Sequence, residues 1–354
     1  MGIQSLIEQT PAWLSGEGEY PELVISSRAR LARNLRAFHF PSQLDEDERQ
    51  RVLEIVRDRI RMIPLFQDAT FVAVRDLSEL DRQFLIERHL MTRDLLKYAD
   101  TAGLIYTEDE TISVLINEED HLRIQVMASG LALREVFQRV LDIDRKLGLL
   151  WPYAFHPEFG YLTSCPTNTG LGLRLSILAH LPGIVLTKHV DPLLKTLVKR
   201  RVGIRGLYGE GSDFYGNIFQ IYTQETLGVT EEELLERFQA TVDEILESER
   251  KARKILTGKL KDVLMDRIER ARATLEHARL ISFDETAQLV SFLRLAVGLG
   301  YYLDLKIRTL NELLLFSQPA HIQKLFGQDL DPRERDQKRA SYIRAKLQAE
   351  AHES

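Results

Sequence analysis

The pattern of apolar residues changes once along this chain, near Gln224, and that change constrains the fold more than any other feature. Before it, from about residue 20 to residue 225, short apolar runs alternate with helical patterns. Residues 111–116 are rich in β-branched side chains, and residues 216–222 alternate between apolar and polar, so both segments predict strands. Residues 44–60 carry apolar side chains among dense charge, which indicates a surface helix.

After Gln224 the chain is predicted to be almost entirely helical. Residues 230–233 (Thr-Glu-Glu-Glu) form a capping-box pattern that opens a long charged helix reaching about Lys254. Residues 282–285 (Ser-Phe-Asp-Glu) open a second, apolar helix that glycines interrupt, and prolines 319 and 332 break the pattern further on. We therefore place a domain boundary near residue 255, between a mixed domain (1–255) and a helical domain (256–354).

The bulk composition limits the partners and the compartment. The chain has 354 residues and a formal net charge of −6, so it has no basic field to attract nucleic acid directly. Its single cysteine, Cys165, rules out an intramolecular disulfide framework and fits a reducing compartment. The sequence shows neither a signal-peptide pattern nor an apolar stretch long enough for a bilayer. We expect a cytoplasmic protein that does not bind membranes.

Five arginines and two isolated glutamates in the N-terminal part indicate the chemistry. A polyphosphate needs several fixed cations, and the arginine fork matches phosphate oxygens bidentately. A planar guanidinium, in turn, needs opposed carboxylates. A chain that supplies both is predicted to be a kinase of guanidino groups. The glutamates are Glu119 and Glu210, and the arginines are Arg28, Arg30, Arg123, Arg174 and Arg205.

The common nucleotide-binding loops are missing from the sequence. It has no Gly-x-x-x-x-Gly-Lys-Ser/Thr loop, no Gly-x-Gly-x-x-Gly, and no His-Arg-Asp or Asp-Phe-Gly triplet, so spaced arginines would have to hold ATP. The nitrogen of a guanidinium acceptor is protonated at ordinary pH, because its pKa exceeds about 12. A nearby carboxylate must orient the group and take a proton as the bond to phosphorus forms. We assign these roles to Glu119 and Glu210.

Several segments resemble motifs of the phosphagen kinases, the family of the creatine and arginine kinases. Residues 117–124 (Asn-Glu-Glu-Asp-His-Leu-Arg-Ile) and 165–174 (Cys-Pro-Thr-Asn-Thr-Gly-Leu-Gly-Leu-Arg) look like its two signature segments. Residues 26–30 (Ser-Ser-Arg-Ala-Arg) resemble its first arginine pair, and residues 205–210 (Arg-Gly-Leu-Tyr-Gly-Glu) resemble the arginine kinase form of its flexible loop. The resemblance covers roughly residues 20–255.

This resemblance implies a fold, a nucleotide and a set of site residues. The fold is α+β: an antiparallel sheet flanked by helices, here followed by the all-helical C-terminal domain. The nucleotide is ATP, with Mg²⁺ carried by ATP rather than by a protein metal site. Cys165 resembles the family's reactive thiol beside the guanidinium, whereas Leu178 departs from the histidine often found at its position. The implied ATP contacts are Ser26, Ser27, Arg28, Arg30, His89, Arg123, Arg174, Ser176, Arg205 and Gly206.

Two departures from the phosphagen kinases concern the substrate. Those enzymes begin with a helical domain whose loop closes over a small free guanidino compound, and we expect no room for that domain before Arg28. Residues 256–354 instead add helices that phosphagen kinases lack. Both features resemble the McsB family of bacterial protein-arginine kinases, and the implied substrate is an arginine side chain within a protein.

Residues 335–340 (Arg-Asp-Gln-Lys-Arg-Ala) fit an Arg-Asp-x-x-Arg-Ala pattern associated with the same family. At helical spacing, Arg335 and Arg339 fall on one face. The resemblance implies a pocket for phosphoarginine, in which these arginines bind the phosphate and Asp336 binds the guanidinium. Such a pocket would let the product regulate activity.

The sequence leaves three functions open. The first is an ATP-dependent protein-arginine kinase that marks proteins in stress response and quality control. The resemblance then implies substrates with exposed arginines, a transcriptional repressor among them, as well as an activating adaptor protein and a Clp-type protease. The second is a kinase of a free small guanidino compound, and the third a non-catalytic adaptor that binds phosphoarginine proteins. The apolar helices after Ser282 could also form a homodimer or a higher oligomer.

Overall fold

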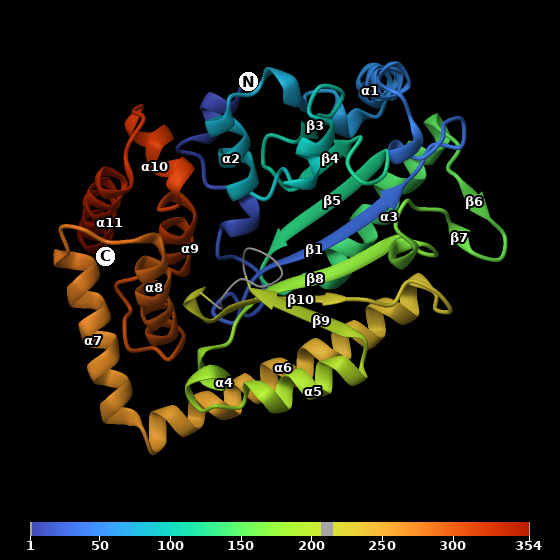
Figure 1. Cartoon of the computed structure of the whole chain (residues 1–354). Coiled ribbons are helices and arrows are strands. Elements are labelled where there is room, and N and C mark those ends of the chain that lie inside the picture. The colour runs from blue at the N-terminus through green and yellow to red at the C-terminus, as the bar shows by residue number, and fades with distance from the viewer. Residues whose placement is uncertain (1, 207–214, 354) are drawn as a thin grey trace.

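An antiparallel sheet forms the centre of the N-terminal part of the protein (Figure 1). The computed structural model describes residues 2–206 and 215–353. Within them the sheet has eight strands in the order β2-β3-β4-β5-β1-β8-β10-β9. The strands are β1 Val24–Arg33, β2 Thr70–Ala73, β3 Gly103–Tyr106, β4 Ile112–Ile116, β5 Leu122–Ser129, β8 Leu173–His180, β9 Val202–Gly206 and β10 Ile218–Thr223. A separate hairpin pairs β6 Phe155–His156 with β7 Gly160–Tyr161.

Helices flank this sheet and form most of the C-terminal part of the described chain. The α-helices are α1 Glu46–Arg59, α2 Glu79–Glu87, α3 Leu133–Leu150, α4 Pro182–Leu186, α5 Val190–Lys199, α6 Glu231–Gly258, α7 Lys261–His277, α8 Phe283–Gly298, α9 Ile307–Phe316, α10 Pro319–Phe326 and α11 Pro332–Glu353. Short 3-10 helices join them at Ile3–Leu6, Ala12–Leu14, Pro41–Gln43, Ile60–Met62, Pro64–Phe66, Val74–Asp76, Asp94–Tyr98, Pro166–Asn168 and Tyr215–Asn217. Within the described residues, each helix is too short or too polar to cross a membrane.

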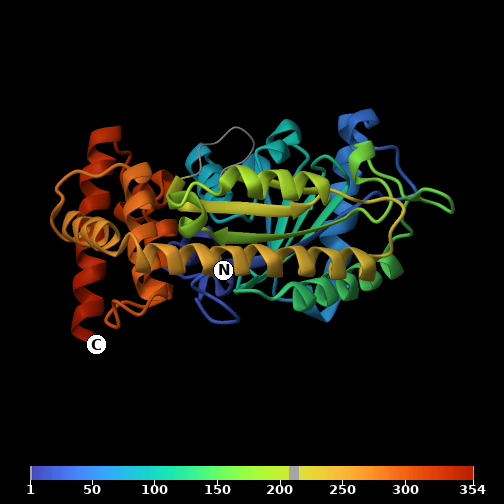
Figure 2. The ribbon, with the colours of Figure 1, turned by 90° about the horizontal axis from the view of Figure 1, so that it is seen from below.

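The two faces of the sheet differ because side chains alternate along each strand. On one face the central strands β1, β5 and β8 present buried aliphatic side chains such as Leu31, Val126 and Leu175. These side chains pack against α3, where Val136 and Val140 are fully buried, and against α6. Seen from below, α6 runs along the sheet toward the C-terminal helices (Figure 2). The other face of the sheet carries polar side chains of the same strands, and the site described below lies on it.

The C-terminal helices are anchored to the sheet domain by apolar and polar contacts. Trp13, in the 3-10 helix Ala12–Leu14, is buried in one core with residues of α8, α9 and α11. Glu87, at the end of α2, accepts hydrogen bonds from the backbone N–H groups of Ala320 (2.9 Å) and His321 (3.0 Å) at the start of α10. The negative charge of the Glu87 carboxylate at the N-terminus of α10 also complements the dipole of that helix. The helical region is therefore attached to the segment that leads into His89.

The structure confirms the predicted α+β class and most of the predicted elements. The strands expected at residues 111–116 and 216–222 are β4 and β10, and the surface helix is α1. Thr230 and Glu233 form the reciprocal capping box at the start of α6, and the Ser282 hydroxyl caps α8 by accepting from the Glu285 N–H. The predicted domain boundary near residue 255 falls inside α6, which continues to Gly258. The boundary itself stays a prediction.

A buried ion pair fastens β1 to α3, and its loss should destabilise the fold. Arg33 donates to both carboxylate oxygens of Asp144 and stacks on Tyr161, whose ring centre lies 3.5 Å from the guanidinium carbon. Asp144→Asn would leave a buried guanidinium without its countercharge, so we expect the free energy of unfolding to fall by about 3 kcal/mol. Chemical denaturation measures it. Asp142→Asn, which breaks the exposed pair with Arg145, is the matched control and should cost less than about 1 kcal/mol. Equal losses would contradict the role given to Arg33.

Candidate active site

The five predicted arginines share the polar face of the sheet, although they come from four strands. The antiparallel register sets Arg30 of β1 opposite Arg174 of β8. Arg123 lies on β5, Arg28 on β1 and Arg205 on β9. All five side chains line one cleft of about 440 Å³. Residues scattered through the sequence thus form a single cationic surface, which suits a polyphosphate.

Five further predicted catalytic or ATP-binding residues line the same cleft, whereas Ser27 and Gly206 are not among the described residues of its wall. Ser26, His89, Glu119, Cys165 and Ser176 join the five arginines in its wall.

Ser27 points to the opposite face because it alternates with its neighbours along β1. Its buried hydroxyl donates to the carbonyl of Gly130 (2.9 Å) and accepts from the N–H of Ala132 (2.9 Å), so it is not free for a nucleotide. Gly206, paired with Phe219, ends β9 and is not among the described residues that line the cleft. Glu210 lies outside the described residues.

Burial and mutual repulsion disfavour the charged forms of the arginines on this surface. Burial, followed by the charges of Arg123, Arg205 and Arg174, lowers the pKa of Arg28 to about 9. The same two effects, burial first, lower the pKa of Arg30 and that of Arg174. Bound phosphate oxygens would relieve this repulsion, because they would add negative charge beside the guanidinium groups.

Glu118 is a site residue that the sequence analysis missed. It forms an ion pair with Arg123 and accepts a hydrogen bond from the hydroxyl of Thr92. Its burial alone would raise the pKa of its carboxyl, but Arg123, Thr92 and Arg30 outweigh burial and lower that pKa to about 2. Glu118 is therefore ionised at any ordinary pH and fixes Arg123 in place. Its position beside Glu119 in the motif was the available signal.

Glu119, the next residue, is exposed to the cleft, and its contacts differ from those of Glu118. The side-chain amide of Asn168 donates to its carboxylate (3.1 Å), and the amide oxygen of Asn168 accepts from Arg174 (3.2 Å). Partial burial of the carboxylate, then the charges of Asp120 and Glu118, raise the pKa of Glu119. A raised pKa makes a carboxylate a better proton acceptor near neutral pH. The geometry therefore fits the predicted base.

His89 and Cys165 both line the cleft. His89 has a left-handed backbone (φ 57°), and its ring meets that of Trp13 edge-on at 5.5 Å. Burial, then the charges of Arg28 and Arg205, lower the pKa of His89 to about 4, so the ring is neutral at pH 7. The sulfur of Cys165 lies 2.9 Å from the hydroxyl oxygen of Thr167, in the segment that also carries Asn168.

The predicted phosphoarginine motif lies on α11, away from this cleft. The guanidinium of Arg339 is buried and donates to the carbonyls of Ser317 (2.6 Å) and Ile281 (2.9 Å). It also pairs with Asp336, whereas Arg335 is half-buried and donates to the carbonyl of Leu330. Arg339 thus fixes α11 against the ends of neighbouring helices and holds the Asp336 carboxylate at the surface.

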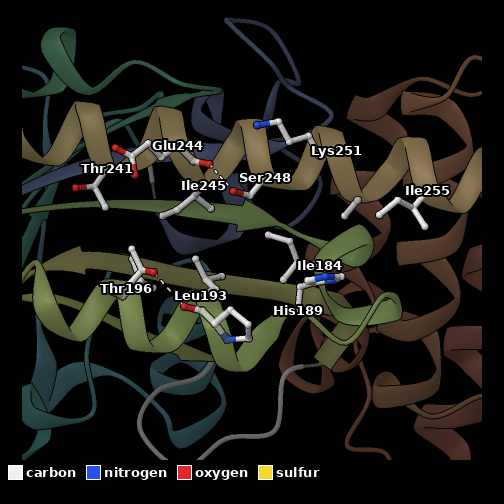
Figure 3. Close-up of a pocket in the computed structure, with 13 residues that line it drawn as sticks. Ile184, His189, Leu193, Thr196, Thr241, Glu244, Ile245, Ser248, Lys251 and Ile255 are labelled. Carbon is white, nitrogen blue, oxygen red and sulfur yellow. Dashed lines mark hydrogen bonds between the residues drawn. The ribbon is translucent and has the colours of Figure 1, made fainter.

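A second cavity of similar size lies between α5 and α6 (Figure 3). It measures about 400 Å³, and its wall is mainly apolar, with Leu193, Ile245 and Ile255 beside His189 and Lys251. Its lining includes no predicted site residue from the part of the chain that the structure describes. Volume does not distinguish the two cavities, but the convergent charges do, and they favour the arginine cleft.

Comparison with known proteins gives a consistent result along the chain. Residues 51–252 match the family described as ATP:guanido phosphotransferase, C-terminal catalytic domain. Residues 261–354 match the protein-arginine kinase McsB C-terminal domain. The chain is 41% identical over 353 residues to a protein-arginine kinase of Symbiobacterium thermophilum (99% of this chain, 100% of the relative). It is 37% identical over 348 residues to one of Halothermothrix orenii (98% and 99%).

Solved structures are similar to about two thirds or more of this chain. The substrate-free duplicated taurocyamine kinase from Schistosoma mansoni superimposes with a TM-score of 0.59 at 26% identity, over 73% of this chain and 37% of that one. Lombricine kinase gives a TM-score of 0.57 at 22% identity, over 68% and 71% of the two chains. The similarity to lombricine kinase supports a shared fold alone.

Removing one of these charges tests how much the arginine surface lowers the free energy of unfolding. Arg28→Met should raise the free energy of unfolding without ligand by about 1 kcal/mol at pH 7, because it relieves burial and repulsion. The unfolded state, with the ordinary pKa of 12.5, holds its proton longer than the folded state at about 9. Between these two pKa values the free energy of unfolding of the wild type therefore rises with pH. The difference in this free energy between the variant and the wild type should shrink above about pH 9.

Chemical denaturation with and without tripolyphosphate measures both effects, and the wild type should gain more from the ligand. Arg57→Met on the exposed surface of α1 is the matched control and should change stability by less than about 0.5 kcal/mol. A variant that is less stable than the wild type without ligand would contradict the repulsion argument.

Proposed function

This chain belongs to the protein-arginine kinases, and on that premise we propose which residues carry its reaction. It is an ATP-dependent phosphotransferase that phosphorylates arginine side chains of proteins. One observation carries the assignment of roles: five arginines share one sheet face, and Glu119 is exposed to the cleft that they line. This arrangement supplies cations for a polyphosphate and a carboxylate for a guanidinium.

The arginines would hold the phosphates of ATP and stabilise the charge that develops on them during transfer. Arg123 would act from a position fixed by Glu118, and Arg174 from a position fixed by Asn168. Mg²⁺ on the ATP phosphates would neutralise part of their charge. Among the described residues, no group of three His, Cys, Asp or Glu side chains could hold a metal ion, and in our proposal Mg²⁺ arrives with the nucleotide.

Glu119 would be the general base. A guanidinium nitrogen of the substrate arginine attacks the γ-phosphorus of ATP, and the bond from that phosphorus to the bridging oxygen breaks. ADP leaves, and the proton of the attacking nitrogen passes to the Glu119 carboxylate. The hydrogen bond from Asn168 orients that carboxylate, and Cys165 would lie beside the guanidinium. Glu210, outside the described residues, is proposed as the second carboxylate of the clamp.

His89, neutral at pH 7, would contact the nucleotide without adding charge, and Ser26 and Ser176 lie close enough to the arginines to assist. Ser176 already accepts a hydrogen bond from Arg28 at 3.2 Å.

We propose that the motif on α11 is a regulatory site for phosphoarginine. The support is its arrangement: Arg339 is committed to backbone carbonyls, and it holds Asp336 at the surface beside Arg335. Product bound there would change activity in the distant cleft through the contacts that connect the helical region to α2.

We also propose a cytoplasmic role in stress response and protein quality control. Its substrates would include a transcriptional repressor, with an activating adaptor protein and a Clp-type protease as partners, and the chain would act as a homodimer or higher oligomer. The two alternatives, a kinase of free guanidino compounds and a non-catalytic adaptor, are less well supported. The full-length relatives are named protein-arginine kinases, and the described part of the catalytic set is intact.

Activity can be tested with labelled ATP, Mg²⁺ and either an arginine-rich protein or free arginine. The wild type should place acid-labile, alkali-resistant label on the protein alone, as expected for a phosphorus–nitrogen bond. Glu119→Gln should lower kcat by about 10²–10⁴-fold while the Kd for ATP stays within about twofold. Arg123→Ala should instead weaken ATP binding by about tenfold or more.

Glu158→Gln, in the exposed β6–β7 turn, is the matched control and should behave as the wild type. Near-normal turnover of Glu119→Gln would remove the base assignment. Label on free arginine alone would favour the second function, and no label in either reaction, even with an activating adaptor, would favour the third.

Regulation is tested on α11. Arg335→Ala and Asp336→Asn should each abolish the change in rate that added free phosphoarginine causes, and weaken phosphoarginine binding by about tenfold or more, because each removes one charged contact. The basal rate should stay within about twofold. Gln337→Ala, exposed on the same helix, is the control. Unaltered binding and unaltered response in both variants would remove the pocket.

A further inference from the structure

Two phenylalanine rings are exposed on the small hairpin that β6 and β7 form. Phe155 is 57% exposed and Phe159 is 48% exposed. The hairpin projects from the end of the sheet at which β5 begins, and Glu119 lies just before β5 (Figure 1). Aromatic side chains are enriched in the interfaces between proteins, and exposed apolar patches mark sites of interaction. Two such rings at one turn therefore indicate a surface that another polypeptide contacts.

Neighbouring rings hold both phenylalanines in place. The ring of Phe155 meets that of Tyr161 edge-on, with 5.3 Å between their centres, and the ring of Phe159 stacks on His156 at 4.9 Å. Tyr161 is itself fixed, because the guanidinium carbon of the buried Arg33 lies 3.5 Å from the centre of its ring. A partner that binds these rings does not have to order them first, which lowers the entropic cost of binding.

The hairpin is joined directly to the segment that orients Glu119. The N–H of Tyr161 donates to the carbonyl of Gly170 (2.8 Å), and the N–H of Gly170 donates to the carbonyl of Tyr161 (3.1 Å). Gly170 belongs to residues 165–170, which also carry Asn168, the hydrogen-bond donor to the Glu119 carboxylate (3.1 Å). A short series of hydrogen bonds thus connects the exposed hairpin to the proposed base.

Gly160 allows the hairpin to lie close against this segment. Its backbone is left-handed (φ 74°), and an added Cβ atom would lie 2.6 Å from the carbonyl oxygen of Gly170. Both the conformation and the space therefore require glycine there. The paired hydrogen bonds between Tyr161 and Gly170 hold the hairpin at this wall of the cleft.

A substrate polypeptide comes within reach of this hairpin. When its arginine lies beside Glu119, its backbone lies at the mouth of the cleft, one side-chain length away. Each further residue of an extended chain adds about 3.3–3.6 Å. Residues a few positions from the arginine can therefore extend along the 165–170 segment to the hairpin. A folded substrate buries most of its large apolar side chains, whereas an unfolded segment presents them to the two rings.

We propose that the rings of Phe155 and Phe159 bind apolar side chains of the substrate polypeptide close to its target arginine. The proposal rests on the function given above, because it requires a protein arginine beside Glu119. The two rings favour arginines in segments whose apolar residues are exposed, as in an unfolded chain. They act on the protein substrate and leave the binding of ATP unchanged.

The test compares two peptides, each with a single arginine, as substrates of the full-length protein with MgATP. One peptide has leucines on both sides of the arginine, and the other has serines at the same positions. The wild type should have a kcat/KM about tenfold higher for the leucine peptide, because apolar surface is buried against the rings.

Replacing both rings should remove this preference. In the double variant Phe155→Ser with Phe159→Ser, the kcat/KM for the serine peptide and the KM for ATP should stay within about twofold of the wild type. Phe155→Leu with Phe159→Leu keeps apolar side chains and should retain most of the preference. Leu303→Ser is the matched control, because Leu303 is 92% exposed between α8 and α9. Glu158→Gln, in the same turn, retains both rings, so both controls should keep the preference.

Equal kcat/KM values of the wild type for the two peptides, or a preference that survives in the double serine variant, would overturn the role of the rings. Label on an arginine-rich protein but on neither peptide would also overturn it. An unchanged preference with loss of self-association in that variant, measured by analytical ultracentrifugation, would assign the hairpin to an interface between copies of the chain. Failure of the wild type to label either the peptides or the protein would instead contradict the proposed function.

Discussion

The repulsion among arginines on one face of the sheet is the constraint to which the rest of the active site responds. Burial and the neighbouring guanidinium groups lower the pKa of Arg28 to about 9. A mobile loop could relax by letting such charges move apart. Paired strands cannot, because the ladder fixes their spacing at about 4.8 Å. The apolar opposite face, packed on α3 and α6, makes that ladder rigid, and the energy stored in the repulsion becomes available to bind phosphate.

Several of the described contacts that hold the cleft cations in place are neutral. Only one of the contacts described is a full countercharge, the Glu118 carboxylate on Arg123. Two others are neutral: the side-chain oxygen of Asn168 accepts from Arg174, and that of Gln220 accepts from Arg205. Another buried ion pair, between Arg33 and Asp144, lies on the opposite face of the sheet and joins a strand to a helix.

Local pattern predicted the strands β4 and β10, the helix α1 and the cap at Thr230 correctly, because each depends on near neighbours in sequence. Which residues share the cleft depends on strand register, which no local pattern contains. Ser27 was assigned to ATP although alternation along β1 turns its hydroxyl to the other face. The pairing of Arg30 with Arg174 could not be expected from either strand alone. For the same reason, the contact between Glu87 and α10 could not be expected from either segment alone.

The central claim is that one sheet face brings the phosphates of ATP to a protein arginine beside Glu119. A crystal structure with MgADP, nitrate in place of the transferred phosphoryl group, and an arginine-containing peptide would test it most directly. We predict that the phosphates contact the five arginines and that a guanidinium nitrogen lies about 2.6–3.2 Å from a carboxylate oxygen of Glu119. The nucleotide in the cavity between α5 and α6, or the peptide arginine bound away from Glu119, would contradict the account.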